Sequence, residues 1–373
     1  MKILLASGGT GGHVCPAMGL AEVFSDHHEV VMVIGQSYIE DTLLKCTDKI
    51  KIERITVSRL PEAGNVSWIS FLKSIWGAFR ASLKIVRQFR PDVVIGFGSY
   101  ASVPVVLAAR WAGLPTLIHE QNVIPGKANR LLSKWVRGIA ISFPQTQELW
   151  NFHSCVRITG NPSILRFRNA ECGMRNAEFT PHSEIRIPHF EEGRFTLLIM
   201  GGSQGAHSIN ELMIQVMPKW LKRHPDQERY VQMIHLTGQR DFEKVKHSYQ
   251  YLRMPVYMAP FNDQMGQFYQ MSHLVVGRAG ATSLSEFAYF GLPSILIPYP
   301  YAGAHQFENA KIFAQEGASV VLDQKGVTSD EVVTILHSLV TSKEKLSKMQ
   351  EANLHLVIPD AEKRFFELIR EVL

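Results

Sequence analysis

The first residues that could do chemistry close a glycine run near the start of the chain. Residues 8–13 read GGTGGH, with His13 directly before a helix-like segment. A glycine turn between a strand and a helix lets the backbone approach a ligand, and the helix N-terminus offers N–H groups that suit phosphate. An imidazole here can act as a general base, or it can simply cap or pack the helix. The pattern is neither the G-x-G-x-x-G of a dinucleotide site nor a P-loop.

Two further segments use the same device. Residues 201–205 read GGSQG after another strand-like run, and their polar side chains can donate to phosphate or sugar oxygens; a tight structural turn is the alternative. Residues 281–286 read ATSLSE, with small hydroxyl residues at a predicted helix start and Glu286 one turn later. This carboxylate could accept both hydroxyls of a ribose, or the segment could be a capping box that serves its own helix.

These loops must be held by the elements around them. Strand-like runs alternate with helix-period segments, which is typical of α/β units with parallel sheets. Residues 92–122 and 273–300 share one plan of strand, glycine turn, helix, Gly-Leu-Pro and next strand, so we expect two Rossmann-like halves. The strand-like runs are residues 2–7, 29–35, 92–98, 115–120, 138–143, 195–202, 230–238, 273–280 and 293–300.

A polar, proline-punctuated segment separates the halves. We expect an N-terminal domain over residues 1–163, a linker or mobile loop over 164–194 and a C-terminal domain over 195–358. Residues 359–373 predict a capped amphipathic helix that packs back on the N-terminal domain, with Phe365, Phe366, Ile369 and Leu373 on its docking face.

The composition of the 373 residues is that of an ordinary globular protein. The formal net charge of +5 is too small to imply nucleic acid, but it is compatible with an anionic ligand or membrane surface. The four cysteines are widely spaced and form no CxxC pair, which argues against a zinc site and a disulfide framework and fits a reducing cytoplasm. We expect no signal peptide and no membrane-spanning segment.

Seven motifs together resemble one known family. GGTGGH, GFGSYASVP, HEQN, GNP, GGSQG, ATSLSE and HQFENA occur in the order and spacing of the lipid II-forming N-acetylglucosaminyltransferases of bacterial cell-wall synthesis, the MurG family. The resemblance implies a GT-B fold, in which two Rossmann-like domains face each other across a cleft. It also implies an inverting transfer of GlcNAc from UDP-GlcNAc to the C4 hydroxyl of MurNAc in lipid I, without metal or cofactor.

The same resemblance assigns roles to individual residues. The candidate general base is His13, with Glu120 as its rival, and Asn122 is similar to the family's donor-sugar contact. His305 and Gln306 match positions that contact sugar hydroxyls. The remaining substrate-binding positions, for diphosphate, ribose and uracil, are Thr10, Gly11, Gly12, Ser203, Asn262, Ala281, Thr282, Ser283, Leu284, Ser285 and Glu286.

Two positions depart from the family pattern, and at one of them some members carry Gln where His305 stands. Ile164 stands where the family commonly has an arginine, and Arg166 and Arg168 follow it. With no D-x-D motif in the sequence, we expect the leaving UDP to be stabilised by helix N-termini and by Arg278 or Arg166.

A lipid acceptor requires a membrane-facing surface. Residues 67–90 predict an amphipathic helix, which could be an interfacial patch for anionic lipid or a core-packed helix with a solvated basic face. Its predicted apolar face comprises Trp68, Leu72, Ile75, Trp76, Phe79, Leu83 and Val86. Its cations are Lys73, Arg80, Lys84 and Arg87.

The sequence therefore predicts a peripheral enzyme on the cytoplasmic face of the bacterial inner membrane. Its expected partners are UDP-GlcNAc, lipid I (undecaprenyl-pyrophosphoryl-MurNAc-peptide), an anionic membrane surface and other cell-wall synthesis proteins, with no nucleic acid. Two alternatives remain open: a UDP-GlcNAc 2-epimerase of the same fold, and a non-catalytic scaffold that binds a nucleotide sugar.

Overall fold

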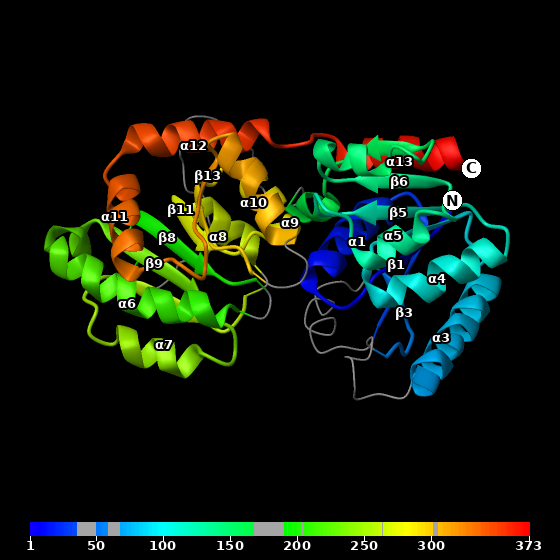
Figure 1. Ribbon diagram of the computed structural model, residues 1–373, viewed down its shortest axis with the longest axis horizontal. Helices are drawn as coiled ribbons and strands as arrows, with labels where there is room; N and C mark the ends of the chain where they lie inside the picture. The colour runs from blue at the N-terminus through cyan, green and yellow to red at the C-terminus, as the bar shows by residue number, and fades with distance from the viewer. Residues whose placement is uncertain are drawn as a thin grey trace. The chain divides into compact units, whose positions relative to one another are not determined.

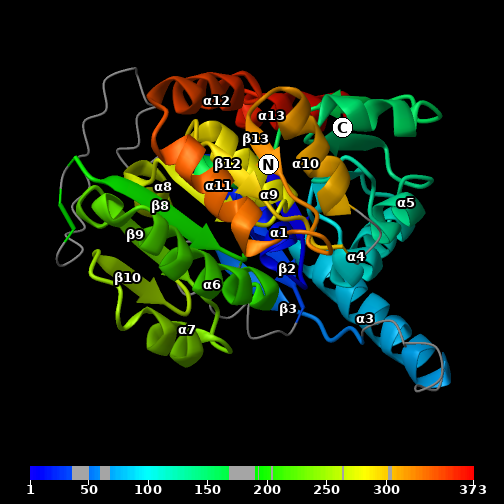
Figure 2. The same cartoon turned by 60° about the vertical axis from the view of Figure 1, so that its left-hand side comes forward.

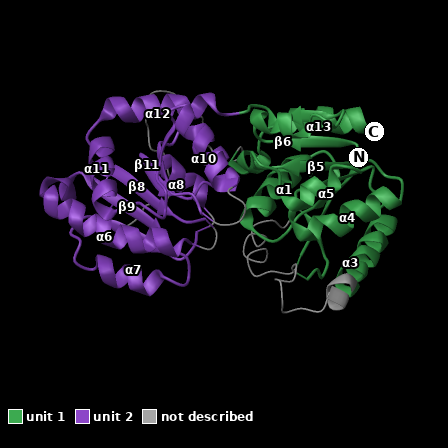
Figure 3. Ribbon diagram, viewed as in Figure 1, with its two compact units in different colours: residues 1–168, 358–373 green, residues 169–357 purple. Residues whose placement is uncertain are grey.

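The computed structural model describes residues 1–35, 50–58, 68–167, 190–191, 193–202, 205–262, 264–300 and 305–373, with backbone alone over 68–72. It divides into two compact units (Figure 3). Unit 1 comprises Met1–Arg168 and Ile358–Leu373, and unit 2 comprises Asn169–Val357. Each unit holds one parallel sheet with helices packed against it (Figure 1), which confirms the predicted fold class of two Rossmann-like α/β domains.

Unit 1 is built on a seven-stranded sheet in the order β3-β2-β1-β4-β5-β6-β7. Its strands are β1 (Lys2–Ala6), β2 (Glu29–Ile34), β3 (Lys51–Arg54), β4 (Val93–Gly96), β5 (Thr116–Glu120), β6 (Gly138–Ile141) and β7 (Val156–Ile158). Its described helices are α1 (Gly11–Phe24), α3 (Trp68–Phe89), α4 (Ser99–Trp111), α5 (Lys127–Leu132) and α13 (Ala361–Val372), with 3-10 helices η1 (Pro144–Trp150) and η2 (Pro162–Phe167).

Unit 2 is built on a six-stranded sheet in the order β10-β9-β8-β11-β12-β13. Its strands are β8 (Phe195–Met200), β9 (Val231–Leu236), β10 (Val256–Ala259), β11 (Leu274–Gly277), β12 (Ser294–Leu296) and β13 (Ser319–Val321). Its described helices are α6 (His207–Arg223), α7 (Phe242–Tyr249), α8 (Met265–Met271), α9 (Ala281–Tyr289), α10 (His305–Gln315), α11 (Ser329–Val340) and α12 (Lys343–His355), with the 3-10 helix η3 (Pro225–Arg229).

The strand order places all three candidate loops at reversal points. In unit 1 the order turns between β1 and β4, and in unit 2 it turns between β8 and β11. Ligands of open parallel sheets bind beyond the carboxyl ends of the strands at such points. The GGTGGH loop follows β1, the GGSQG loop follows β8 and the ATSLSE segment follows β11. Each unit therefore presents its glycine loop where a ligand is expected.

The apolar face predicted for α3 is only partly buried, and the buried stripe also includes small residues outside that prediction. Ala78, Ser82 and Val86 are buried, and α3 lies along α4 in both views (Figures 1 and 2). Trp76, by contrast, is 62% exposed and stacks on the half-buried Phe79 at a centroid distance of 5.7 Å. Trp68 and Leu72 lie outside the described side chains. None of the helices in the described ranges is long and apolar enough to span a bilayer.

The last helix and the start of the expected linker both pack on unit 1. Helix α13 lies against β6, β7 and η2 and buries Phe365 and Ile369, together with Leu368 and Val372. Leu373, predicted for this docking face, is 53% exposed. Residues 162–167 form η2 against α1, and residues 168–189 lie outside the description.

Candidate functional site

His13 lies in the first turn of α1, half buried, and its neighbours fix which nitrogen carries the proton. Its Nδ1 lies 2.8 Å from the carbonyl oxygen of Phe97 and 3.1 Å from Oε1 of Gln121. Both oxygens only accept, so Nδ1 donates and the lone pair of the neutral ring is on Nε2. Gly98 provides the room, because a Cβ there would lie 3.1 Å from the imidazole and its φ is +82°. His13 is thus arranged to take a proton through Nε2.

Gln121 is held in place from the core. Its Nε2 donates to the Phe97 carbonyl at 2.9 Å and lies 3.2 Å from Nδ1 of His119. Complete burial lowers the pKa of His119 to about 3, so that ring is neutral, and its Nε2 donates to the carbonyl of Gly160 at 3.2 Å. A flipped Gln121 amide would set two acceptor oxygens against each other, so the orientation that anchors His13 is fixed.

Glu120, the rival base, holds the turn after β5. One carboxylate oxygen accepts from the backbone and side-chain nitrogens of Asn122 at 2.9 and 3.2 Å. The other accepts from the backbone of Gly126 at 2.9 Å and from Nδ2 of Asn129 at 2.8 Å. Glu120 is 1% exposed. A buried carboxylate with four donors serves the turn, and the geometry favours His13 as the base.

The other unit 1 candidates lie at the start of α1 and beyond β7. Thr10 is the N-cap residue of α1, its side chain makes no capping hydrogen bond, and it is exposed together with Gly12, whereas Gly11 is buried. Ile164 is buried in η2. Burial raises the pKa of Glu22 on α1, and the nearby charge of Arg166 partly offsets that rise. Arg166 therefore lies beside α1, while Arg168 lies outside the described residues.

In unit 2, the residues of the ATSLSE segment divide between the helix start and the core. Ala281 is the first residue of α9, and the N-cap residue before it is Gly280. Thr282 is buried and Ser283 half buried, whereas Leu284 belongs to the core. The hydroxyl of Ser285 donates to the Ala281 carbonyl at 2.9 Å. Leu284 therefore packs in the core of unit 2, and the Ser285 hydroxyl bonds within its own helix.

Glu286 is oriented by a residue that the sequence did not single out. The hydroxyl of Tyr269, on α8, donates to its Oε2 at 2.7 Å. Tyr269 is 1% exposed and Glu286 6% exposed, so this hydrogen bond is shielded from water. The capping-box alternative loses support, because the Glu286 carboxylate bonds to α8 and the N-cap of α9 is Gly280, not Thr282 or Ser283.

The remaining predicted contacts lie near the described ends of loops. Asn262 accepts from the backbone of Gln264 at 2.7 Å and donates to the Tyr257 hydroxyl at 3.3 Å, so its side chain closes a turn. His305 is the first residue of α10, and Gln306 accepts from the backbone of Tyr299 at 2.9 Å. Ser203 lies outside the described residues.

Among the described residues, Arg278 places a guanidinium beside the start of α6. Its guanidinium donates to the carbonyl of Ile297 and to the hydroxyl of Ser208, both at 2.7 Å, and lies over the ring of Tyr299 at 5.4 Å. Because Ser208 is in the first turn of α6, Arg278 brings positive charge to the end of the GGSQG loop. Among the described residues, no three His, Cys, Asp or Glu side chains are grouped to hold a metal ion.

Sequence reasoning singled out the candidate reacting groups and missed the residues that contact them in the structure. Gln121 stood inside the HEQN motif without a role, and Asn129 and Tyr269 belonged to no motif. The position of the Gln121 amide next to Glu120 in this motif was the signal in the sequence that could have pointed to it. Tyr269 reaches Glu286 from another helix, and a single sequence contains no signal for that contact.

Comparisons with known proteins agree over the whole chain. Family models match the glycosyltransferase family 28 N-terminal domain at residues 3–141 and its C-terminal domain at residues 196–365. The UDP-N-acetylglucosamine–N-acetylmuramyl-(pentapeptide) pyrophosphoryl-undecaprenol N-acetylglucosamine transferase of Syntrophotalea carbinolica is 35% identical, covering 100% of this chain and 99% of that protein. The transferase of the same name from Halothermothrix orenii is 34% identical, with the same coverage.

Solved structures of both enzymatic interpretations share this fold, and sequence identity is what distinguishes them. Acinetobacter baumannii MurG is similar with a TM-score of 0.71 and 26% identity over 99% of both chains. A UDP-GlcNAc 2-epimerase from Neisseria meningitidis reaches a TM-score of 0.69 at only 15% identity over 100% of both chains, which shows the shared fold alone. The epimerase alternative is therefore not favoured. The chain belongs to glycosyltransferase family 28 and, within it, to the MurG family of N-acetylglucosaminyltransferases.

Proposed function

We propose that the chain transfers GlcNAc from UDP-GlcNAc to the C4 hydroxyl of MurNAc in lipid I, with inversion at the transferred sugar, to give lipid II and UDP. Full-length similarity to the named transferases supports the reaction. The observation that carries the mechanism is the tautomer of His13, whose Nδ1 proton is engaged by two acceptors. That arrangement favours catalysis over a scaffold role.

His13 acts as the general base. As the C4 oxygen of the acceptor attacks C1 of GlcNAc, the bond from C1 to the diphosphate oxygen breaks and the hydroxyl proton passes to Nε2 of His13. The electron pair of the broken bond leaves with UDP. Gln121 and the Phe97 carbonyl hold the ring in the accepting tautomer until it takes this proton, and both still accept from Nδ1 in the imidazolium that forms.

Unit 2 supplies the donor-binding groups. Glu286 accepts hydrogen bonds from the ribose hydroxyls. The N-terminus of α9, over Ala281 to Ser283, faces phosphate oxygens. The start of α6 and the guanidinium of Arg278 stabilise the charge that develops on the leaving diphosphate. The contact of Arg278 with Ser208 supports this role, because it fixes the cation next to the loop that follows β8.

The acceptor is delivered from a membrane, and we assign its docking to α3. The four cations of this helix, Lys73, Arg80, Lys84 and Arg87, are all exposed. Trp76 is exposed on the same helix, and Trp111 at the end of α4 is 78% exposed. Exposed tryptophans beside cations are typical of proteins that bind anionic lipid surfaces. The proposal places the protein peripherally on the cytoplasmic face of the bacterial inner membrane.

One incubation tests the reaction. Purified protein is given labelled UDP-GlcNAc and a short-chain lipid I analogue, and the products are separated. We expect a disaccharide lipid with an inverted linkage, together with stoichiometric UDP. Formation of an epimerised nucleotide sugar, or binding of UDP-GlcNAc without turnover, would contradict the proposal.

A further inference from the structure

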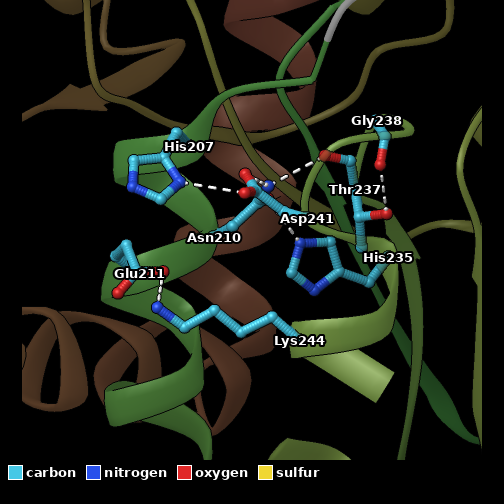
Figure 4. Close-up of polar contacts among 8 residues, drawn as sticks. All are labelled: His207, Asn210, Glu211, His235, Thr237, Gly238, Asp241 and Lys244. Carbon is cyan, nitrogen blue, oxygen red and sulfur yellow. Dashed lines mark hydrogen bonds and ion pairs between the residues drawn. The ribbon is translucent and has the colours of Figure 1, made fainter. Parts of the chain in front are cut away.

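Asp241 stands where a helix cap is expected but does not act as one. It is the N-cap residue of α7, yet its side chain makes no capping hydrogen bond. Figure 4 shows it turned toward α6 instead, where Oδ2 accepts from Nδ2 of Asn210 at 2.8 Å and Oδ1 from Nδ1 of His207 at 2.9 Å. A capping bond contributes about 1 kcal/mol, so the structure forgoes a favourable local use of this carboxylate.

These bonds belong to a network that runs from the core to the surface of unit 2. Both hydrogens of the Asn210 amide are used, on the carbonyl of Thr237 at 2.8 Å and on Asp241, so its Oδ1 accepts from Nε2 of His235 at 3.0 Å. Burial lowers the pKa of His235 to about 3, and Tyr249 donates to its Nδ1 at 3.2 Å. Every hydrogen-bonding proton in this network therefore has one consistent position.

The network ends on the oxygen against which the GGSQG loop packs. A Cβ on Gly205, whose φ is +74°, would lie 2.3 Å from the carbonyl oxygen of Thr237, the oxygen that Asn210 holds. A Cβ on Gly201 would lie 2.1 Å from the backbone nitrogen of Ala206. The two described ends of the loop are thus stacked on each other and on the turn after β9, with no space between the layers.

We propose that Asp241 is a positioning residue for the donor diphosphate, holding the turn after β9 and the first turn of α6 so that Gly201 and Gly205, at the two described ends of the GGSQG loop, stay in place. The inference rests on the proposed function, in which this loop faces the diphosphate of UDP-GlcNAc. Asp241 acts through Asn210 and His207 and does not itself touch the donor.

The electrostatics suit this role. Burial raises the pKa of Asp241, but hydrogen bonds from Asn210 and His207, with the charges of His207 and Arg240, outweigh it and leave the pKa below its ordinary value. The carboxylate is therefore ionised at neutral pH and accepts from both partners. His207 is exposed, so Asp241 ties a surface residue at the start of α6 to the buried amide.

The test compares two ligands within each variant, so that general destabilisation cancels. Direct binding of UDP and of uridine, which lacks the diphosphate, is measured for the wild type, Asp241→Ala and Asp241→Asn. The matched control is Lys244→Ala, which breaks the ion pair between α7 and Glu211 of α6 (Figure 4) without touching the loop. His207→Ala and His207→Asn form a second pair, because the asparagine amide can replace Nδ1 as donor.

For Asp241→Ala we expect UDP affinity to fall about tenfold, the scale of one or two lost hydrogen bonds, with uridine affinity unchanged. Asp241→Asn should lose less, Lys244→Ala should lose nothing, and His207→Asn should bind UDP better than His207→Ala. Equal weakening of UDP and uridine, or no weakening of either, would overturn the inference. A wild-type chain that fails to bind UDP would contradict the proposed function instead.

Discussion

Glu286, the carboxylate proposed to hold the ribose, offers a sharp test, because a buried hydroxyl on another helix bonds to it. Tyr269→Phe removes the 2.7 Å hydrogen bond to Glu286. The ring can keep its contacts with Phe287 and Phe290, at centroid distances of 5.7 and 5.3 Å. The substitution therefore changes the polar contact of the carboxylate and leaves the aromatic packing of α8 on α9 in place.

The expected magnitudes follow from the burial of both groups. Glu286→Gln removes the charge that accepts the ribose hydroxyls, so UDP affinity should fall by about 1.5–3 kcal/mol, or about 10- to 150-fold. Tyr269→Phe leaves the charge but removes one hydrogen bond that orients it, so we expect a smaller loss of about three- to tenfold. Because a buried polar group loses a donor, Tyr269→Phe should also lower the free energy of unfolding of unit 2 by about 1–3 kcal/mol.

Calorimetric titration separates these effects. UDP and 2′,3′-dideoxy-UDP are titrated into the wild type, both single variants and the double variant. If Glu286 holds the ribose, the dideoxy ligand binds all four proteins with similar affinity, and the double variant loses no more UDP affinity than Glu286→Gln. Equal losses for both ligands in Tyr269→Phe would refute the reasoning, because the tyrosine would then act on the fold of unit 2 and not on the ribose contact.

Four further outcomes are expected. His13→Ala should lower kcat by about 100-fold or more with the Kd of UDP unchanged; a parallel loss of UDP affinity would make His13 a binding residue. Burial lowers the pKa of His119 to about 3 from the ordinary 6.5, so unfolding takes up a proton as pH falls. Between about pH 7.5 and about pH 5.5 the wild type should therefore lose about 1.4 kcal/mol more stability than His119→Gln in urea titrations, and equal slopes would contradict this. Neutralising the four cations of α3 should weaken binding to anionic vesicles by about 1 kcal/mol for each charge near the surface, whereas Trp76→Ser should leave Tm unchanged; salt-insensitive vesicle binding by the wild type would exclude this surface. Because unit 2 offers helix N-termini and Arg278 to the leaving diphosphate, EDTA should leave turnover intact, and loss of activity restored by Mg²⁺ would overturn that part of the mechanism.

The sheets could be predicted because parallel strands are buried on both faces. The central strands read as continuous apolar runs, and every predicted run is a strand. The strands that the sequence did not reveal, β3, β7, β10 and β13, are the two edges of each sheet. Most of their side chains are half buried or exposed, so no apolar run marks them.

Helix α3 shows the matching limit for helices. Its aromatic residues suggested one broad apolar face, but the buried stripe uses the small residues Ala78 and Ser82 and leaves Trp76 in solvent. Periodicity identifies which residues share a side of a helix. Which side meets the sheet depends on residue size and on α4, and a single sequence does not specify that packing.

The two glycine loops are supported by similar networks whose differences fit their chemistry. In unit 1 a buried neutral histidine, His119, contacts an amide, and that amide and a backbone carbonyl anchor His13. In unit 2 the buried His235 also contacts an amide, that of Asn210, which donates to the Thr237 carbonyl. Here a carboxylate, Asp241, links this amide to the surface residue His207. Neutral acceptors fix the tautomer of His13 without placing a negative charge beside the group that must take a proton. The carboxylate of unit 2 instead ties the start of α6 to the start of α7, which is the link that the proposed positioning of the donor diphosphate uses.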